Sequence, residues 1–284
     1  MTLWHVDQPW PEPGESAVFS TLLSSFYDQS WYGKLLNAEV EFYLQYVREG
    51  FVLELGAGTG RLSVPLFRAG CNLYGIEGSS AMLARLHEKL PPSEQYRFIH
   101  WNAQHTPYPI KAASVDHVII PFSTFGLMHN HVSDLGANRL FHELARLLKP
   151  GGKVILNDFR TTPLDRTQVD QAPWVAQFDH FHAVEGPIRE EQISQFRIVP
   201  NRLCAQQMMR ERVTRFIRLL DSKVLETHVE CIPLWGRDEF PKLGQDAGLT
   251  YLGGILAPDF HDEPSMMHLY QKPVTQFPLS TPVL

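Results

Sequence analysis

Three glycines and two glutamates have the types and spacing of a ligand-binding turn. Gly56, Gly58 and Gly60 alternate in a G-x-G-x-G pattern. Glu54 lies two residues before this pattern, and Glu77 lies 17 residues after its last glycine. Glycines tolerate positive φ and, lacking side chains, let a ligand approach the backbone. A carboxylate beside the turn would repel a pyrophosphate but suits an ammonium group, and the later carboxylate can accept hydrogen bonds from ribose hydroxyls, so the pattern predicts a nucleoside site with an ammonium group.

A strand, a helix and a second strand must position these residues. Residues 51–55 are dense in β-favouring apolar side chains, as expected of a strand buried on both faces. Residues 61–69 follow as a helix, and Gly70 is its expected C-cap. A strand over 72–76 then brings Glu77 to the same edge of a parallel sheet. This order is the nucleotide-binding half of a doubly wound sheet, although a dinucleotide fingerprint would place the third glycine one residue later.

Two sequence runs resemble the class I S-adenosylmethionine-dependent methyltransferases. They are E-L-G-A-G-T-G at 54–60 and G-I-E-G-S-S-A-M-L at 75–83. The extension G-T-G-R-L-x-x-P-L, through Leu66, is similar to the bacterial small-molecule branch. The resemblance covers roughly residues 27–272. It implies an α/β fold, a doubly wound, seven-stranded, mostly parallel Rossmann-like sheet with an antiparallel β insert, and S-adenosyl-L-methionine as cofactor.

The resemblance also implies a set of cofactor-binding residues. Tyr27 lies in the arm that folds over the cofactor in this family; it either touches the methionyl end or packs between two helices. Met82 either packs against the adenine or belongs to the core. Asn102 stands where the family usually has an aspartate, and its amide oxygen can accept from the adenine amine without charge. The full set is Tyr27, Glu54, Gly56, Ala57, Gly58, Gly60, Glu77, Gly78, Met82, Asn102, Ala103, Pro121 and Phe122.

The fourth predicted strand, 114–120, leads to the expected methyl-transfer region. Because ligands bind beyond the carboxyl ends of such strands, residues 121–131 should line the space where donor and acceptor meet. His129 and His131 follow this exit. A histidine near neutral pKa is a natural general base for a hydroxyl or a protonated amine. The same pair also fits a surface loop, and an H-x-H pair can resemble a metal site.

The fifth predicted strand, 153–157, ends at the same cleft. Asp158 and Arg160 leave it and could grip a polar or charged acceptor. Asp158 therefore joins the two histidines as a catalytic candidate. Catechol-type methyltransferases bind a divalent metal with acids at these strand ends, but the fourth-strand exit here carries Pro121 instead of an acid. We therefore expect no metal.

Composition limits the class of partner. The chain has 284 residues, a formal net charge of −6 and three scattered cysteines. This charge argues against a broad basic footprint for nucleic acid, and the fourth-strand exit lacks the N-P-P-Y, D-P-P-Y and Pro-Cys motifs of nucleic-acid methyltransferases. Sparse cysteines without C-x-x-C indicate a reducing compartment, and no apolar run approaches the length of a membrane span. We expect a cytoplasmic protein with a small-molecule acceptor and neither nucleic acid nor membrane as partner.

The insert follows the fifth strand. Residues 191–199, 205–219 and 223–231 are typical of antiparallel strands, whereas 161–187 is expected to be irregular. Four of its arginines, at positions 210, 212, 215 and 218, fall on both faces of such a sheet and fit either solvated charges or ligand contacts. In the resembled family this insert covers the acceptor pocket and can pair subunits, so a homodimer through the insert is expected.

The predicted organisation has five parts. A helix over 235–247 and a hairpin of 249–256 and 266–271 should complete the core sheet after the insert. The parts are a helical arm at 1–50, a cofactor-binding core at 51–160, the insert at 161–235, the end of the core at 236–272 and a tail at 273–284.

The sequence therefore predicts an S-adenosylmethionine-dependent methyltransferase that acts on a small molecule by in-line N- or O-methylation. Two other functions fit part of the pattern. A non-catalytic S-adenosylmethionine-binding scaffold would bind the cofactor without releasing S-adenosylhomocysteine. An NAD-dependent oxidoreductase would need a pyrophosphate at the glycine turn, beside the carboxylate of Glu54.

Overall fold

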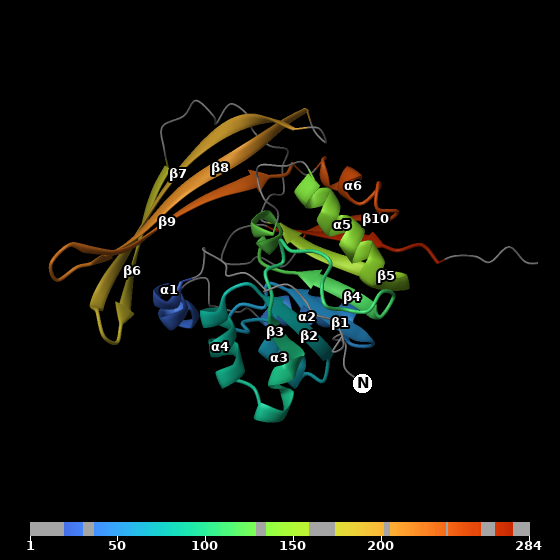
Figure 1. Cartoon of the computed structure of the whole chain (residues 1–284), viewed down its shortest axis with the longest axis horizontal. Helices are drawn as coiled ribbons and strands as arrows, with labels where there is room; N and C mark the ends of the chain where they lie inside the picture. Colours follow the sequence, from blue (N-terminus) through green and yellow to red (C-terminus); the bar gives the residue numbers. More distant parts are fainter. Residues whose placement is uncertain are drawn as a thin grey trace, which may run out of the picture.

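The structure is a computed structural model that describes residues 20–30, 37–128, 135–158, 174–201, 205–236, 238–256 and 265–274. Two sheets organise these residues (Figure 1). The larger contains β1 (Phe51–Leu55), β2 (Asn72–Glu77), β3 (Phe98–His100), β4 (Val115–Ile120), β5 (Leu148–Asp158), β10 (Thr250–Leu256) and β11 (Met266–Gln271). The smaller contains β6 (Trp174–His182), β7 (Gly186–Asn201), β8 (Ala205–Arg218) and β9 (Lys223–Leu234).

The larger sheet has the order β10-β11-β5-β4-β1-β2-β3. The five strands from β5 to β3 run parallel to their neighbours, while β11 pairs antiparallel with β5 and β10 antiparallel with β11. The order reverses at β1, because the chain passes from β1 to β2 on one side and later to β4 on the other. Such a reversal opens a crevice at the carboxyl ends of the strands, where α/β proteins bind ligands.

Helices cover both faces of this sheet. The described α-helices are α1 (Thr21–Phe26), α2 (Asn37–Val47), α3 (Ser63–Arg68), α4 (Ser80–Glu88), α5 (Leu135–Leu147) and α6 (Phe240–Leu243), joined by the short 3-10 helices η1 (Tyr27–Gln29), η3 (Pro92–Arg97) and η4 (Thr124–Leu127). No helix among the residues described here is long and apolar enough to cross a membrane.

Successive side chains of the buried strands pack into two separate hydrophobic cores, one on each face of the sheet. Leu53 of β1 packs in a cluster with residues of α5 and α6, whereas its neighbour Val52 packs with residues of α2, α3 and α4. The same alternation separates Val118 from Ile119 in β4. Side chains of successive strand residues point to opposite faces, so each buried strand needs apolar residues at consecutive positions. The predicted fold, a doubly wound seven-stranded sheet with an antiparallel insert, is confirmed.

The insert differs from its prediction at its first strand. Residues 161–187 were expected to be irregular, but β6 begins at Trp174 and pairs with β7 along its whole length. The prediction was wrong because β6 is stabilised by polar cross-strand partners rather than by an apolar face. Asp179 binds Arg189 at 2.9 Å, and His180 Nε2 lies 2.8 Å from the buried carboxylate of Glu190.

The prediction of a helix over 235–247 is also wrong. Among the residues of this stretch that the structure describes, only α6, four residues long, is α-helical. Pro241 lies in the first turn of α6, where a missing N–H costs least, so the helix begins beside it and not at 235. Upstream, the Glu239 carboxylate accepts a hydrogen bond from Gly236 N at 2.6 Å, which closes a turn instead.

Candidate functional site

The three turn glycines have different roles. All have positive φ: +76° at Gly56, +57° at Gly58 and +86° at Gly60. A Cβ on Gly56 would lie 2.4 Å from Thr124 Cγ2, and one on Gly60 would lie 2.9 Å from Val64 Cγ2, so these two glycines pack against the protein itself. A Cβ on Gly58 would have no heavy atom within 4 Å. Gly58 is therefore where the turn faces open space and where a ligand can approach the backbone.

Glu77 lies at the carboxyl end of β2, directly beneath this turn. One carboxylate oxygen accepts from Gly58 N at 2.7 Å, and the other accepts from Ser79 N at 2.8 Å. Burial raises the pKa of Glu77, and the hydrogen bonds from backbone N–H groups oppose that rise. Each carboxylate oxygen has two lone pairs, so the group can accept further hydrogen bonds from ligand hydroxyls.

Glu54 lies near the end of β1 and is 1% exposed. Ser63 Oγ donates to it at 2.6 Å. Burial raises the pKa of Glu54 from 4.5 to about 8, while the Ser63 hydroxyl and the charge of Arg61 lower it and Glu77 adds to the rise. The carboxyl is therefore mostly protonated at neutral pH, and a nearby ammonium group would favour its ionised form.

Arg61 is a buried cation that the sequence interpretation did not assign to the site. Its two terminal nitrogens donate to the two oxygens of Glu39 at 2.5 and 2.7 Å, and its guanidinium carbon lies 4.4 Å from the centroid of the Phe122 ring. Arg61 thus joins the glycine turn to α2 and to the exit of β4. The available signal was a basic residue directly after Gly60, inside the strongest motif of the chain.

The end of the N-terminal arm lies over the turn. Asp28 accepts from Thr59 Oγ1 at 2.6 Å and pairs with Lys89 at 2.5 Å, and Lys89 also donates to the Thr59 carbonyl. Burial raises the pKa of the Tyr27 hydroxyl to about 12. The positive charge of Arg61 lowers this pKa, and the negative charge of Glu77 raises it. Tyr27 also packs against the cluster that contains Phe26 and Met82, and its contact with the cofactor stays a prediction.

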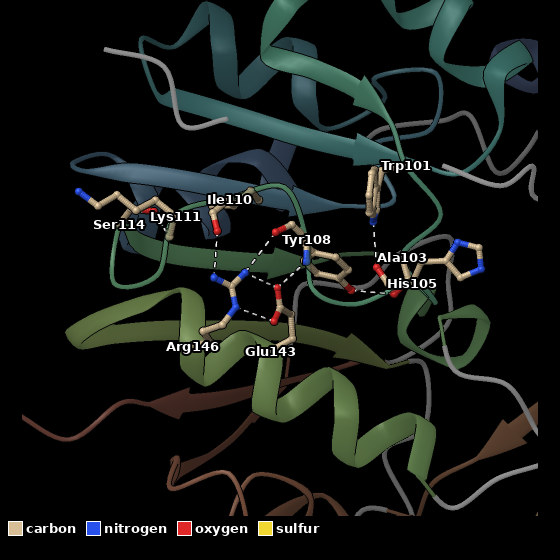
Figure 2. A network of polar contacts seen from close by, with 9 residues as sticks. All are labelled: Trp101, Ala103, His105, Tyr108, Ile110, Lys111, Ser114, Glu143 and Arg146. Atoms are coloured by element: carbon tan, nitrogen blue, oxygen red, sulfur yellow. Dashed lines mark hydrogen bonds and ion pairs between the residues drawn. The ribbon is translucent and has the colours of Figure 1, made fainter. Parts of the chain in front are cut away.

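The loop after β3 carries the residues predicted for the adenine. The Asn102 side-chain oxygen accepts from Gln104 N at 3.0 Å, so its amide helps to shape the loop. The Ala103 carbonyl accepts from the Tyr108 hydroxyl at 2.8 Å, and Trp101 Nε1 donates to the His105 carbonyl at 2.9 Å (Figure 2).

A half-buried ion pair ties the far end of this loop to α5. Arg146 binds both oxygens of Glu143, and Glu143 accepts from Tyr108 N at 2.6 Å (Figure 2). Arg146 also donates to the carbonyls of Ile110 at 3.0 Å and Tyr108 at 3.2 Å. Tyr108 is thus held through its amide, its carbonyl and its hydroxyl, which fixes the loop beside Asn102 and Ala103.

The exit of β4 is strained. Phe122 and Ser123 are consecutive non-glycine residues with φ of +54° and +53°. Such backbone costs of order 1–3 kcal/mol a residue and persists where the surroundings hold it, often at ligand sites. Here Ser123 N donates to the Asn157 side chain at 3.3 Å, and Ser123 Oγ donates to Asp158 at 3.2 Å. The ends of β4 and β5 are therefore linked, with Asp158 between them.

The inner face of the insert bends over both ends of this region. Ile188 and Phe216 pack against α1 and Met82 of α4, so Met82 lies where arm, insert and core meet. Towards the other end, Ile232 packs with Leu127 of η4. Between these contacts the same face carries polar side chains that are less than a tenth exposed, namely Glu190, Gln192, Ser194 and Thr214.

The remaining predicted residues divide into two groups. Ala57 N donates to the Ile76 carbonyl at 3.1 Å, the Gly78 carbonyl lies 3.2 Å from His100 Nε2, and the Pro121 carbonyl accepts from Thr124 Oγ1 at 2.5 Å. His129, His131 and Arg160 lie outside the described residues. Within the described parts of the chain, no group of three or more His, Cys, Asp or Glu side chains could hold a metal ion.

Comparison with known proteins identifies the core. A family model described as a methyltransferase domain matches residues 52–152, from β1 into β5. The match supports a class I S-adenosylmethionine-dependent methyltransferase core over residues 52–152. An uncharacterized methyltransferase of Bacillus cytotoxicus is 30% identical over 145 residues, which are 50% of this chain and 61% of the relative. The chain therefore spans about three fifths of the length of that curated relative.

Solved methyltransferases share the fold over most of the chain. The CcbJ methyltransferase of Streptomyces caelestis is 16% identical with a TM-score of 0.63, covering 90% of this chain and 98% of the other. CalS10 from Micromonospora echinaspora, an amino pentose methyltransferase with S-adenosylmethionine bound, is 14% identical with a TM-score of 0.58, covering 91% and 99%. At these identities the likeness shows the fold alone.

The residues of the turn fit S-adenosylmethionine, the cofactor that the resemblance of this core implies. Open space at Gly58 admits a ligand to the backbone. The Glu77 carboxylate lies beside that space as an acceptor, and the buried acid Glu54 lies on the other side of the turn for an ammonium group. Sequence and structure agree on S-adenosylmethionine as the cofactor, whereas the individual contacts stay predictions.

Proposed function

We propose that this chain transfers a methyl group from S-adenosylmethionine to a nitrogen or oxygen of a small-molecule acceptor. The observation that carries the proposal is the open glycine turn at Gly58, with Glu77 bonded to it from one strand end and the buried Glu54 near the next. A dinucleotide would bring a pyrophosphate to this turn, where the Glu77 carboxylate would oppose it and the buried acid Glu54 would give it no positive partner. An adenosyl group with a charged amino-acid tail has matching acceptors on both sides.

The cofactor, when bound, supplies a methyl group already activated on a sulfonium. The chain then has to orient two reactants and exclude water, which can be worth roughly 7–11 kcal/mol of the barrier. In the proposal, Glu77 binds the ribose hydroxyls and Tyr27 covers the methionyl end. The loop held by Tyr108 carries Asn102 and Ala103 to the adenine, with Met82 beside it.

The acceptor is proposed to lie between the β4 exit and the insert. Asp158 is 4% exposed and bonded to Ser123, so its position is fixed as that of a group receiving a proton must be. His129 and His131 remain candidates for the same role. The buried polar side chains of the insert would recognise an acceptor rich in hydrogen-bonding groups. The name of CalS10, an amino pentose methyltransferase, makes amino sugars the first acceptors to test.

Titration calorimetry and a turnover assay test the proposal together. We expect S-adenosylhomocysteine to bind with micromolar affinity and NAD to give no heat at the same concentrations. Incubation with S-adenosylmethionine and a panel of amino sugars and small amines should release S-adenosylhomocysteine with at least one acceptor. Binding without release across a broad panel would favour the scaffold function, and binding of NAD alone would refute the proposal.

The proposal extends to assembly and location. We propose a homodimer through the insert, whose far end exposes Phe181 (66%), Val184 (84%) and Leu220 (86%). Light scattering of the purified chain should give twice the monomer mass, and Leu220→Lys should return it to the monomer mass. Wild-type protein that elutes as a monomer would contradict this. A cytoplasmic location without nucleic-acid partners is part of the same proposal.

A further inference from the structure

The amino-acid end of the proposed cofactor carries two opposite charges, an ammonium and an α-carboxylate. Glu54 is suited to the ammonium. Among the residues assigned to the cofactor from the sequence, all are acidic or uncharged, so that assignment leaves the carboxylate without a cation. A carboxylate taken into a partly buried site needs a positive or hydrogen-bonding partner, because its desolvation is otherwise costly.

Arg61 is the cation in the right place. It follows Gly60 directly, its side chain is 8% exposed, and its charge lowers the pKa of both Glu54 and Tyr27. Glu54 is the proposed partner of the ammonium group, and Tyr27 is the arm residue proposed to cover the methionyl end. The position of Arg61 next to Gly60, with its guanidinium over the Phe122 ring, places it at the amino-acid end of the proposed site.

The orientation of Arg61 is fixed from two directions. Glu39, 1% exposed, takes two parallel hydrogen bonds from one edge of the guanidinium, and the Phe122 ring covers a face at 4.4 Å. A guanidinium presents its N–H donors in a rigid planar fork, so a bidentate carboxylate fixes the plane of the group. Glu39 and Phe122 thus hold a planar donor group in one position beside the turn.

From this geometry we infer that Arg61 binds the α-carboxylate of the cofactor and, with Glu54, forms a clamp for its zwitterionic end. The inference rests on the proposed function, because it concerns the same site. Arg61 would set the preference for cofactors with an intact amino-acid tail. A purely structural Arg61 would connect α2, the glycine turn and the β4 exit without distinguishing one ligand from another.

Two ligands and one double variant separate these roles. S-adenosylhomocysteine carries both charges, and its decarboxylated analogue keeps the ammonium but lacks the carboxylate. The variant Arg61→Met with Glu39→Gln removes the pair together, so that no buried charge loses its partner. Calorimetry should show a loss of about 10- to 100-fold in affinity for S-adenosylhomocysteine, as for a charged hydrogen-bonded pair, and less than about 3-fold for the analogue.

The wild-type protein should itself prefer S-adenosylhomocysteine to the analogue by a similar factor. Equal losses for both ligands in the double variant would overturn the assignment of Arg61 while leaving the proposed function in place. Wild-type protein that binds neither ligand would overturn the proposed function first. Arg85→Met, on the exposed face of α4, is the matched control and should leave both affinities unchanged.

Arg61→Lys gives a second measurement if the double variant does not fold. A lysine keeps the charge but not the fork of donors. We expect the preference for S-adenosylhomocysteine over the analogue to fall several-fold in Arg61→Lys. An unchanged preference in a folded Arg61→Lys protein would overturn the inference.

Discussion

Glu77 is bonded directly to the glycine that faces open space: its Oε2 accepts from Gly58 N at 2.7 Å, across 19 residues of sequence. The second strand of the nucleotide-binding half thus holds the turn made by the first. The carboxylate proposed to bind ribose hydroxyls is also the group that sets the position of the turn backbone. Ligand contact and turn geometry are therefore coupled through one side chain.

This coupling predicts the effect of Glu77→Gln. The amide removes the charge and turns an NH2 group towards one of two backbone N–H donors, so the turn loses a charge-assisted bond worth about 1.5–3 kcal/mol. Affinity for S-adenosylhomocysteine should fall by about 10- to 100-fold in calorimetry. Glu88→Gln, on the exposed side of α4, should bind as the wild type does. Wild-type affinity in Glu77→Gln would contradict a role for Glu77 in the site.

The raised pKa of Glu54 predicts a dependence of stability on pH. The folded-state pKa of about 8 lies above the ordinary value of 4.5, so the folded protein resists losing this proton. The contribution of Glu54 to stability is fully present below pH 4.5 and is lost as the pH rises through 8. Denaturant unfolding should show the stability of wild type relative to Glu54→Gln decreasing between these values.

The same proton links pH to ligand binding. An ammonium group beside Glu54 favours the carboxylate, so the affinity for S-adenosylhomocysteine should increase from pH 6 to pH 8 as the proton becomes easier to remove. Calorimetry in two buffers of different ionisation enthalpy would detect the released proton. A flat pH profile in the wild type, or the same slope in Glu54→Gln, would contradict this account.

Local chemistry explains what the sequence could predict. The glycine turn and Glu77 lie within one strand–helix–strand unit. The residues that form this unit are close together in the sequence, so its turn and strand ends could be predicted from a short segment. The Arg61–Glu39 pair depends instead on how α2 packs, and the two residues are 22 positions apart. The strand β6 was missed because its partners for Asp179 and His180 lie on β7 and no apolar alternation marks it. Which glycine faces open space also depended on Thr124 and Val64, side chains outside the motif.

The difference between turn glycines can be tested with alanine. In Gly58→Ala the residue must keep φ near +57°, which costs about 1–2 kcal/mol for a residue with a Cβ. The new methyl group would also stand in the space proposed for the cofactor. Gly70→Ala is the matched control, because φ there is +89° and its Cβ would likewise meet nothing within 4 Å. Both variants should lose similar stability in denaturant unfolding, and only Gly58→Ala should lose affinity for S-adenosylhomocysteine.

The half-buried pair of Arg146 and Glu143 in Figure 2 predicts an effect on the adenine side. Arg146→Met leaves Glu143, whose side chain is 5% exposed, without its partner and removes donors from the carbonyls of Tyr108 and Ile110. We expect a loss of about 1–3 kcal/mol in unfolding free energy and a several-fold weaker affinity for S-adenosylhomocysteine. Replacing both partners, as Arg146→Met with Glu143→Gln, removes the unpaired charge but keeps an acceptor for Tyr108 N, and should restore part of the stability. Full affinity in a destabilised Arg146→Met would show that the pair does not position the loop.

The contacts of Asp28 predict how the arm controls ligand release. Asp28 and Lys89 are 41% and 32% exposed at their side chains, so their ion pair is worth at most about 1 kcal/mol. Asp28→Asn keeps an acceptor for Thr59 but loses the charge, and S-adenosylhomocysteine should dissociate up to about fivefold faster in stopped-flow measurements. Lys89→Met should have a similar effect, and the double variant should be no faster than either, because both remove the same pair. High salt screens the pair and should bring the wild-type rate towards that of Asp28→Asn. Additive effects of the two substitutions would mean that Asp28 and Lys89 act on the ligand separately and that the arm is not held closed by their contact.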